Sequence, residues 1–511
     1  MALGIVGFHR SWGAEGKTFT PLNQKVLTDL VAANKMPEAF TEAFEHGDEL
    51  FESSFNEFDG GGAKVGFVVP GGSMIRYTRT PRADRSGTGE WANHFPKRAT
   101  GPNAAGCAEC HNIPFDGSGT NNSNVHRDPL HSGDLTKFIQ RNTPHLFAPG
   151  ALQKLAEEMT ADLLSIRQEA TNAACAGPVG NIQTRALASK GTGFGSLSVV
   201  RQASPGACAV SINNSQVQGV DTSLVVKPFQ WKGSVAFLRD FIRGACHNEI
   251  GMQPVELTGS NQDGDGDGVS NEMSVGDQTA LAVYLASQPR PTTLLELNTL
   301  KLLETPLTTA QVYQINRGNA QFTSMGCAAC HSPSKTLSNA VFSEPSQMPQ
   351  YRDAVFPGGQ NPASELVSPA QSLKVDLVLD PPDNVIFKNP ANPKSNVVFR
   401  LGGLKRSGTT GAIVDLFSDL KRHDLGIEVA EPIDEDGNGA SVFLTKPLWG
   451  IGSTAPYMHS GDAPTLTKAI ALHGGEAAAS RSNFNAASPG AKDDLIAFMK
   501  NLVLFALPGS D

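Results

Sequence analysis

The stretch that decides how this chain folds is Cys107-Ala108-Glu109-Cys110-His111, and the same pattern returns at Cys327-Ala328-Ala329-Cys330-His331. In Cys-x-x-Cys-His the two thiols reach the two vinyl groups of one porphyrin, and the adjacent histidine binds the iron as its proximal ligand. A zinc or thioredoxin-like site is disfavoured, because both pairs carry the histidine and no second pair lies close enough to complete a zinc site. The sequence therefore predicts two covalently bound c-type haems.

The composition limits the fold and the partners. The chain has 511 residues, of which 39% are hydrophobic, while 52 Gly and 33 Pro indicate much irregular chain. We expect a mainly α protein of two cytochrome c-type haem domains, with long irregular loops and insertions. The net charge of -9 argues against nucleic acid, whose phosphates require clustered Lys and Arg. It leaves room for a basic electron donor, such as a small cytochrome or a cupredoxin.

The surroundings of the protein follow from its apolar runs and its cysteines. No apolar run approaches the roughly 18 residues that cross a bilayer, so we expect no membrane span. This type of haem attachment occurs outside the cytoplasm, which predicts a periplasmic or secreted protein whose leader has been removed or replaced. Cysteines in such compartments tend to pair, so we predict a disulfide between Cys175 and Cys208 and a free thiol at Cys246.

Hydrophobic periodicity locates the helices and a domain boundary. The segment 177–228 is polar and weakly strand-like, which indicates an insertion. The run Gln288-Pro289-Arg290-Pro291 is a linker signal and predicts domains 1–290 and 291–511, with one haem each. Helices are expected over 37–59, 149–175, 237–244 and 277–286. Two more are expected because 310–325 resembles the helix before a haem motif in cytochromes c and 491–505 resembles their closing helix.

Four motifs follow one another in the C-terminal part: DLKRHDLG at 419–426, PLWG at 447–450, TAPYMHSG at 454–461 and LHGGEA at 472–477. Taken in this order, they resemble the diheme oxidoreductase family, in the superfamily of bacterial diheme cytochrome c peroxidases, methylamine-utilisation diheme enzymes and rubber oxygenases. The resemblance implies that the first haem is the catalytic one and that the second relays electrons to it.

The resemblance also implies the second distal ligand. In the bacterial peroxidases a methionine fourteen residues after the TAPY-x-His histidine binds the second iron, and the same count from His459 arrives at His473. Imidazole in place of thioether stabilises ferric iron and lowers the potential, as in the rubber oxygenases. Met458 is the rival ligand, and the alternative role of His473 is that of a core or surface histidine.

The block 229–252 resembles the peroxidase segment that runs from an inter-haem tryptophan to a distal-pocket glutamate. The resemblance places Trp231, His247 and Glu249 at the catalytic site, with Glu249 moving a proton between the two peroxide oxygens. The spacing from Trp231 to Glu249 is two residues shorter than in the peroxidases. The structural alternatives are a core aromatic at Trp231 and a solvated charge at Glu249.

The distal side of the first haem has three readings. The iron is open or water-bound, or it is closed by His126 or His131 in the loop before Arg141-Asn142-Thr143-Pro144, or His247 or Cys246 reaches it. Loop histidines beside haems often bond only the propionates.

Calcium is expected between the haems. In the peroxidases this ion is held by residues that match Asn142, Thr454 and Pro456 here, and hard oxygen ligands suit it. The loop Asp263–Gly268 has the alternating carboxylates of an EF-hand-like site, but Ser274 stands where a bidentate Glu is expected. A similar run from Asp434 to Gly439 is a weaker candidate.

These observations favour a diheme redox enzyme that acts on peroxide or dioxygen, first of all a peroxidase. The alternatives are a haem-dependent oxygenase or oxidase of an organic or protein substrate, and a non-catalytic periplasmic electron-transfer cytochrome.

Overall fold

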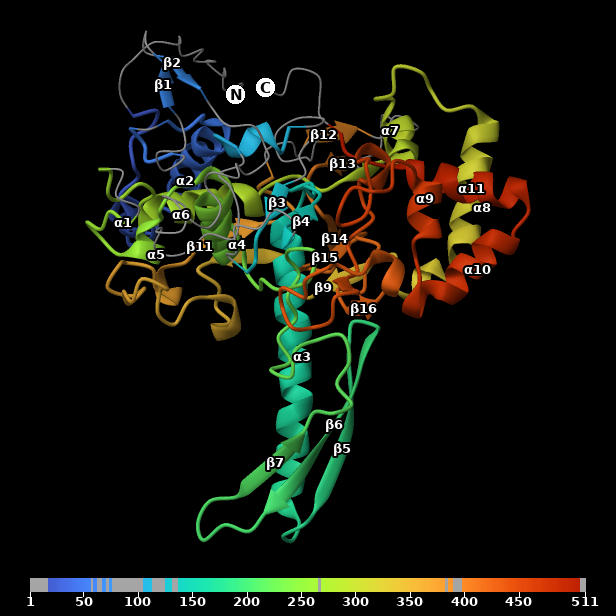
Figure 1. The fold of residues 1–511 in the computed structure, drawn as a ribbon, viewed down its shortest axis with the longest axis horizontal. Helices are drawn as coiled ribbons and strands as arrows, with labels where there is room; N and C mark the ends of the chain where they lie inside the picture. The colour runs from blue at the N-terminus through green and yellow to red at the C-terminus, as the bar shows by residue number, and fades with distance from the viewer. Residues whose placement is uncertain are drawn as a thin grey trace.

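The structure, a computed structural model, describes residues 17–56, 58–61, 104–112, 125–130, 137–264, 268–381 and 401–505, with backbone alone at 67–69, 73–75, 126, 385–388 and 398–400. Two groups of helices lie on opposite sides of the molecule, and a long arm projects from between them (Figure 1). The first group contains α1 (Gln24–Ala32), α2 (Met36–Glu52), α4 (Leu238–Ala245), α5 (Val255–Thr258) and α6 (Val275–Ala286). The second contains α7 (Leu294–Leu300), α8 (Thr309–Ser324), α9 (Leu466–Ala471), α10 (Ala478–Ala486) and α11 (Pro489–Lys500).

Small antiparallel sheets connect these helices, so helix is accompanied by more strand than we expected. In the pair β16–β17, Arg422 lies opposite Leu444, so part of the 419–426 motif pairs with the segment that follows Glu431. The paired strands are β1 (Phe67–Val69) with β2 (Ser73–Ile75), β3 (Val125–Arg127) with β4 (Ile139–Arg141), β8 (Thr292–Thr293) with β18 (Leu502–Val503), β10 (Val341–Glu344) with β11 (Leu373–Asp376), β12 (Val385–Lys388) with β13 (Val398–Leu401), β16 (Arg422–Asp424) with β17 (Val442–Leu444), and β15 (Gly411–Val414) between β9 (Lys335–Leu337) and β14 (Lys405–Ser407).

Helix α6 is the centre of the first group, because every one of its residues is buried. Its start is fixed by a capping box, in which Ser274 and Asp277 bond each other's backbone N–H groups. The Asp277 carboxylate also accepts the Leu22 N–H at 2.8 Å and contacts His46 Nε2 at 2.7 Å. Asp277 therefore ties the beginning of the chain and α2 to the central helix.

The second group is built on the crossing of α8 and α11. A side chain at Gly318 of α8 would meet the Asp494 carbonyl oxygen at 1.9 Å, so the two backbones approach closely only because this residue is glycine. Phe322 and Phe498 pack across the contact, with ring centres 5.4 Å apart. Their cluster also includes Cys327, at the second haem motif.

The arm is formed by the far end of α3 (Pro149–Ala176) and a three-stranded sheet, β5 (Ile182–Ser189), β6 (Thr192–Gln202) and β7 (Ala209–Asn213), in that order (Figure 1). Cys175 and Cys208 form a disulfide here, which confirms the predicted pairing. The segment 177–228 is thus an ordered insertion rather than a loop.

All six predicted helices are present, as α2, α3, α4, α6, α8 and α11. Two end earlier than predicted: α2 stops at Glu52, and Leu502–Val503 form strand β18 instead of continuing α11. The boundary at residue 290 stays a prediction, and the larger hydrophobic core extends across it to Trp449. None of the helices in the described ranges combines the length and the apolar composition needed to cross a bilayer.

Candidate active site

A cavity opens at the first haem motif. Five residues selected from the sequence line it together, although they come from distant parts of the chain: Cys107, Cys110, His111, Trp231 and Glu249. Cys246 and Asn142 also line it. The thiols, the histidine and the apolar walls fit a covalently held haem.

A tight turn brings the attachment residues to this cavity. The turn η3 (Cys107–Glu109) is closed by hydrogen bonds from the Cys110 and His111 N–H groups to the Cys107 carbonyl, both 3.1 Å long. Burial raises the pKa of the Cys107 thiol, and the neighbouring Cys246 and Cys110 thiols raise it further. The three thiols therefore lie in one apolar environment. Cys246 is not disulfide-bonded, as predicted.

The opposite wall is the continuation of α4. After Ala245 the helix widens into a π-helical turn, η5 (Cys246–Ile250), a feature often found at functional sites. This turn places Asn248 and Glu249 on the cavity wall beside Cys246. His247 is 4% exposed and is not among the described residues that line the cavity. The side chains of His126 and His131 lie outside the described residues.

Trp231 stands where the two halves of the chain meet. Its Nε1–H donates to the Asn142 carbonyl oxygen at 2.8 Å, and the Asn142 N–H donates to the His459 carbonyl oxygen at 2.6 Å. The Trp231 and His459 rings are 6.5 Å apart, and His459 stacks on Phe443 at 4.3 Å. A cavity residue and a residue of the C-terminal motifs are therefore in ring contact.

A buried ion-pair network holds this junction together. Arg141, which lines the cavity, donates hydrogen bonds from both terminal nitrogens to the Glu431 carboxylate, and its guanidinium lies 3.2 Å from Glu435. Burial alone would lower the pKa of Arg141, and the two carboxylates raise it above its ordinary value. The fully buried Lys232 ammonium lies 3.7 Å from Glu431. Loss of one partner would leave an uncompensated buried charge, which costs about 3–5 kcal/mol.

At the second haem motif two histidines face each other. The rings of His331 and His473 have centres 6.4 Å apart. Since a metal–imidazole bond is about 2 Å long and each ring centre lies roughly 1 Å behind its nitrogen, two imidazoles in line across one iron would be about 6 Å apart. The Nδ1–H of His331 donates to the Phe417 carbonyl oxygen at 3.1 Å, and that of His473 to Ala469 at 2.7 Å. Both bonds leave Nε2 for a metal, so the pair fits a bis-histidine iron.

The sequence reasoning missed a charged group beside this site. His423 Nε2 lies 2.8 Å from Asp419, and its Nδ1 lies 2.7 Å from Glu476. Burial lowers the pKa of His423, but the two carboxylates and Cys330 raise it to about 10, so the imidazole is charged at neutral pH. Ligand-capable atoms of Cys330, Asp419 and His423 lie within 4.8 Å of one another. The only sequence signal for Asp419 and His423 was their place in the 419–426 motif.

The predicted calcium ligands are partly brought together. Asn142 Nδ2 donates to the Pro456 carbonyl oxygen at 2.7 Å, whereas the Thr454 hydroxyl is directed to Gly450 at 3.4 Å. In the loop at Asp263 the Gly268 N–H donates to the Asp263 carboxylate at 2.9 Å, and residues 265–267 lie outside the described ones. These contacts do not test whether calcium binds.

Comparison with known proteins places the C-terminal part in a family. Residues 404–502 match the family described as "Di-haem oxidoreductase, putative peroxidase". This match covers about a fifth of the chain, includes His423, His459 and His473, and confirms the resemblance. Residues 404–502 thus resemble a di-haem oxidoreductase, a family whose description implies two haems and redox chemistry. No curated protein sequence matches the chain.

Solved structures give distant likenesses. One is a MauG-like protein associated with microbial copper homeostasis, with 16% identity, a TM-score of 0.25, and coverage of 57% of this chain and 74% of that one. Another is the diheme peroxidase BthA from Burkholderia thailandensis E264, with 16% identity, a TM-score of 0.27, and coverage of 54% and 65%.

Proposed function

We propose that this chain is a diheme c-type cytochrome that reduces peroxide at its first haem and relays electrons to it from its second. Cys107 and Cys110 would hold the first haem covalently, with His111 on its iron. Cys327 and Cys330 would hold the second, with His331 and His473 on its iron. The observation that supports this proposal most directly is that the two sites differ. The second is closed by two facing histidines, whereas the first is a cavity with a carboxyl group on its wall.

This difference supports one reactive and one relaying centre. A haem iron with a free position binds peroxide oxygen and supplies electrons to it, whereas an iron with two protein ligands only exchanges electrons. Among the described lining residues of the first cavity, His111 is the one histidine.

Glu249 is the residue we assign to proton transfer. Cleavage of an O–O bond requires a proton to leave the oxygen nearer the iron and to arrive on the other, and a carboxyl group within hydrogen-bonding reach does both. Its place on the cavity wall beside Asn248 supports this role. His247 would act from behind this wall, as a residue that positions the π-helical turn.

Trp231 is the proposed link for electrons. Its ring lines the first cavity and contacts His459, which belongs to the C-terminal motifs. An oxidisable ring between the two haems would divide one long electron transfer into two shorter ones. Calcium at Asn142, Thr454 and Pro456 would lock the two halves at this junction. We further propose a periplasmic or secreted location and a small cytochrome or cupredoxin as electron donor.

The test is Glu249→Gln, which keeps the shape of the side chain but removes its titrating proton. Peroxide turnover should fall by roughly 10²- to 10⁴-fold while both haem spectra stay unchanged. Asp240→Asn is the matched control, since Asp240 lies on α4, pairs with Arg243 and does not line the cavity. If the Gln variant turns over peroxide as fast as the parent, Glu249 is a structural charge.

One observation favours the oxygenase alternative. A bis-histidine second centre has a low potential, which suits a protein that keeps its catalytic iron reduced for dioxygen. If neither parent nor variant reacts with peroxide but both bind dioxygen at the first haem, the oxygenase function replaces the peroxidase function. Two low-spin ferric signals in an electron paramagnetic resonance spectrum would instead favour a non-catalytic electron carrier.

A further inference from the structure

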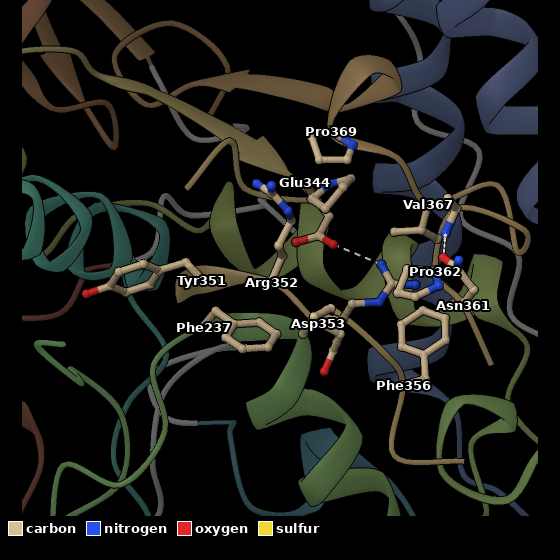
Figure 2. A pocket seen from close by; sticks show the side chains of 14 residues that line it. Phe237, Glu344, Tyr351, Arg352, Asp353, Phe356, Asn361, Pro362, Val367 and Pro369 are labelled. Carbon is tan, nitrogen blue, oxygen red and sulfur yellow. Dashed lines mark hydrogen bonds and ion pairs between the residues drawn. The ribbon is translucent and has the colours of Figure 1, made fainter. Parts of the chain in front are cut away.

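A second cavity, of about 200 Å³, uses the beginning of α4 as one wall (Figure 2). Phe237 and Arg239 line this cavity, whereas Phe241 and Ile242, the next residues along the helix, line the haem cavity. The remaining walls come from the end of β10 and from residues 345–369. No residue in the described part of the chain lines both cavities, so we treat the second one as a separate site.

An acid with an open oxygen lies in this cavity. The Glu344 side chain is 4% exposed, and its Oε1 accepts a hydrogen bond from Arg239 Nη1 at 2.8 Å. Among the described residues, no hydrogen bond to its second oxygen, Oε2, accompanies this one, and Glu344 lines the cavity. A ligand in the cavity can therefore donate a hydrogen bond to this oxygen.

The charges around Glu344 leave a deficit of positive charge. Glu256 is fully buried and is shared by Arg239, at 2.6 Å, and Arg243, at 2.9 Å. Asp353 takes a second bond from Arg243, at 3.0 Å. Asp240 also pairs with Arg243, at 2.7 Å, but its side chain is 41% exposed to solvent. Three buried carboxylates thus face two guanidinium groups. Burial raises the pKa of Glu344 to about 7, Arg239 opposes this, and Glu256 and Asp353 add to it.

The third guanidinium of the cavity does not correct this deficit. Arg352 turns Nη1 toward the carbonyl oxygens of Ser346 and Gln347, at 2.8 and 2.7 Å. In Figure 2 the guanidinium of Arg352 points away from the Glu344 carboxyl group, whereas the dashed line from Glu344 runs to Arg239. One positive charge beside Oε2 would therefore complete the cluster.

The rest of the wall is apolar and aromatic. Phe237 and Phe356 face the cavity near Glu344, together with Pro345, Pro362 and Pro369 (Figure 2). Tyr351 contributes only its ring to the cavity wall, because its hydroxyl group points away from the cavity and forms a 2.7 Å hydrogen bond with Thr160. Apolar walls around a single polar anchor are typical of sites for small organic molecules, and aromatic rings also attract cations.

We propose that this cavity binds a small organic amine in its protonated form, with the ammonium group on Glu344 Oε2 and an apolar body against Phe237 and Phe356. The site goes beyond the proposed peroxide chemistry and does not depend on it.

Isothermal titration of the haem-loaded protein with benzylamine tests the proposal. Benzylamine should bind at least about tenfold more tightly than benzyl alcohol, which has the same body without the charge, since a charge-assisted hydrogen bond is roughly twice as strong as a neutral one. Glu344→Gln keeps the bond to Arg239 and should weaken benzylamine binding by at least about tenfold. Asp240→Asn is the matched control and should bind like the parent, because Asp240 is outside the cavity and its side chain is 41% exposed.

A second variant tests the proposal independently if Glu344→Gln does not fold. Ala354 is exposed at the edge of the cavity, so Ala354→Leu should narrow the cavity without disturbing the buried network and should abolish benzylamine binding. The proposal is overturned if benzylamine does not bind the parent, if benzoate binds more tightly than benzylamine, or if Ala354→Leu leaves the affinity for benzylamine unchanged.

Discussion

The change of His473 to Met is the sharpest test of the second centre. His473 faces His331 with ring centres 6.4 Å apart, and its Nδ1–H donates to the Ala469 carbonyl oxygen at 2.7 Å. A carbonyl partner of this kind makes the imidazole a stronger ligand and stabilises the ferric state. A methionine thioether has no such partner and favours the ferrous state.

The expected size of the effect follows from this exchange of ligands. Met/His ligation raises the potential of c-type haems, and we expect the midpoint potential of one haem to rise by roughly 100 mV or more. At 59 mV for each factor of ten, this shift changes the ratio of ferrous to ferric iron about 50-fold. The other haem should keep its potential, because His473 is not among the described residues that line the first cavity.

Spectroelectrochemical titration of the two haems measures this shift. Met458→Leu is the control, because Met458 is the rival ligand and its replacement should leave both potentials unchanged. If His473→Met leaves both potentials where they were, or if Met458→Leu shifts one of them instead, the bis-histidine assignment is wrong.

Three further predictions concern other parts of the molecule. Removal of calcium with EGTA should change the spin state of one haem or slow electron transfer between the haems, because the junction at Asn142 and Pro456 would lose an ion; identical spectra and rates would refute this. The double variant Cys175→Ser, Cys208→Ser should keep both haem spectra but make the arm sensitive to trypsin, since a disulfide across a sequence separation of 33 contributes about 3–4 kcal/mol. An arm that stays resistant would show that α3 and its sheet need no cross-link. Burial lowers the pKa of Lys446 from its ordinary value of 10.5 to about 8. Between these two pH values Lys446 is protonated in the unfolded chain but not in the folded one, so the free energy of unfolding rises with pH. Lys446→Met should therefore raise Tm at pH 7 and have little effect at pH 10.5 in calorimetry, and a lower Tm at pH 7 would mean that the cation is stabilising.

Much of the fold was predictable from local pattern. Four of the six helices were indicated by local pattern and two by their resemblance to helices of cytochromes c. The two cysteines that flank the Gly/Ala/Ser-rich part of the insertion indicated its disulfide. The helix ends were less predictable, because β18 replaces the last turn expected of α11 only by pairing with β8 in a distant part of the chain. The small sheets were missed for the same reason, since strands of three or four residues carry too little periodicity to be recognised.

The residues of the candidate site were likewise only partly predictable from the sequence. The thiols and histidines of the haem motifs were found from their spacing, and His473 from its distance to a family motif. The carboxylates around His423 were signalled only by their place in the family motifs, and the network of Arg239, Glu256 and Glu344 gave no sequence signal. Glu344 and Arg239 are 105 residues apart and meet only because α4 and β10 both pack against α6.

The sequence by itself determined the chemistry that depends on neighbours in the chain: two Cys-x-x-Cys-His sites, the order of the family motifs and the main helices. Only the tertiary structure decided which distant groups meet without such a signal, namely Trp231 with His459 and Glu344 with Arg239. The physical reason is that covalent spacing fixes what adjacent side chains can reach, whereas contacts between distant residues depend on how the helices and strands pack.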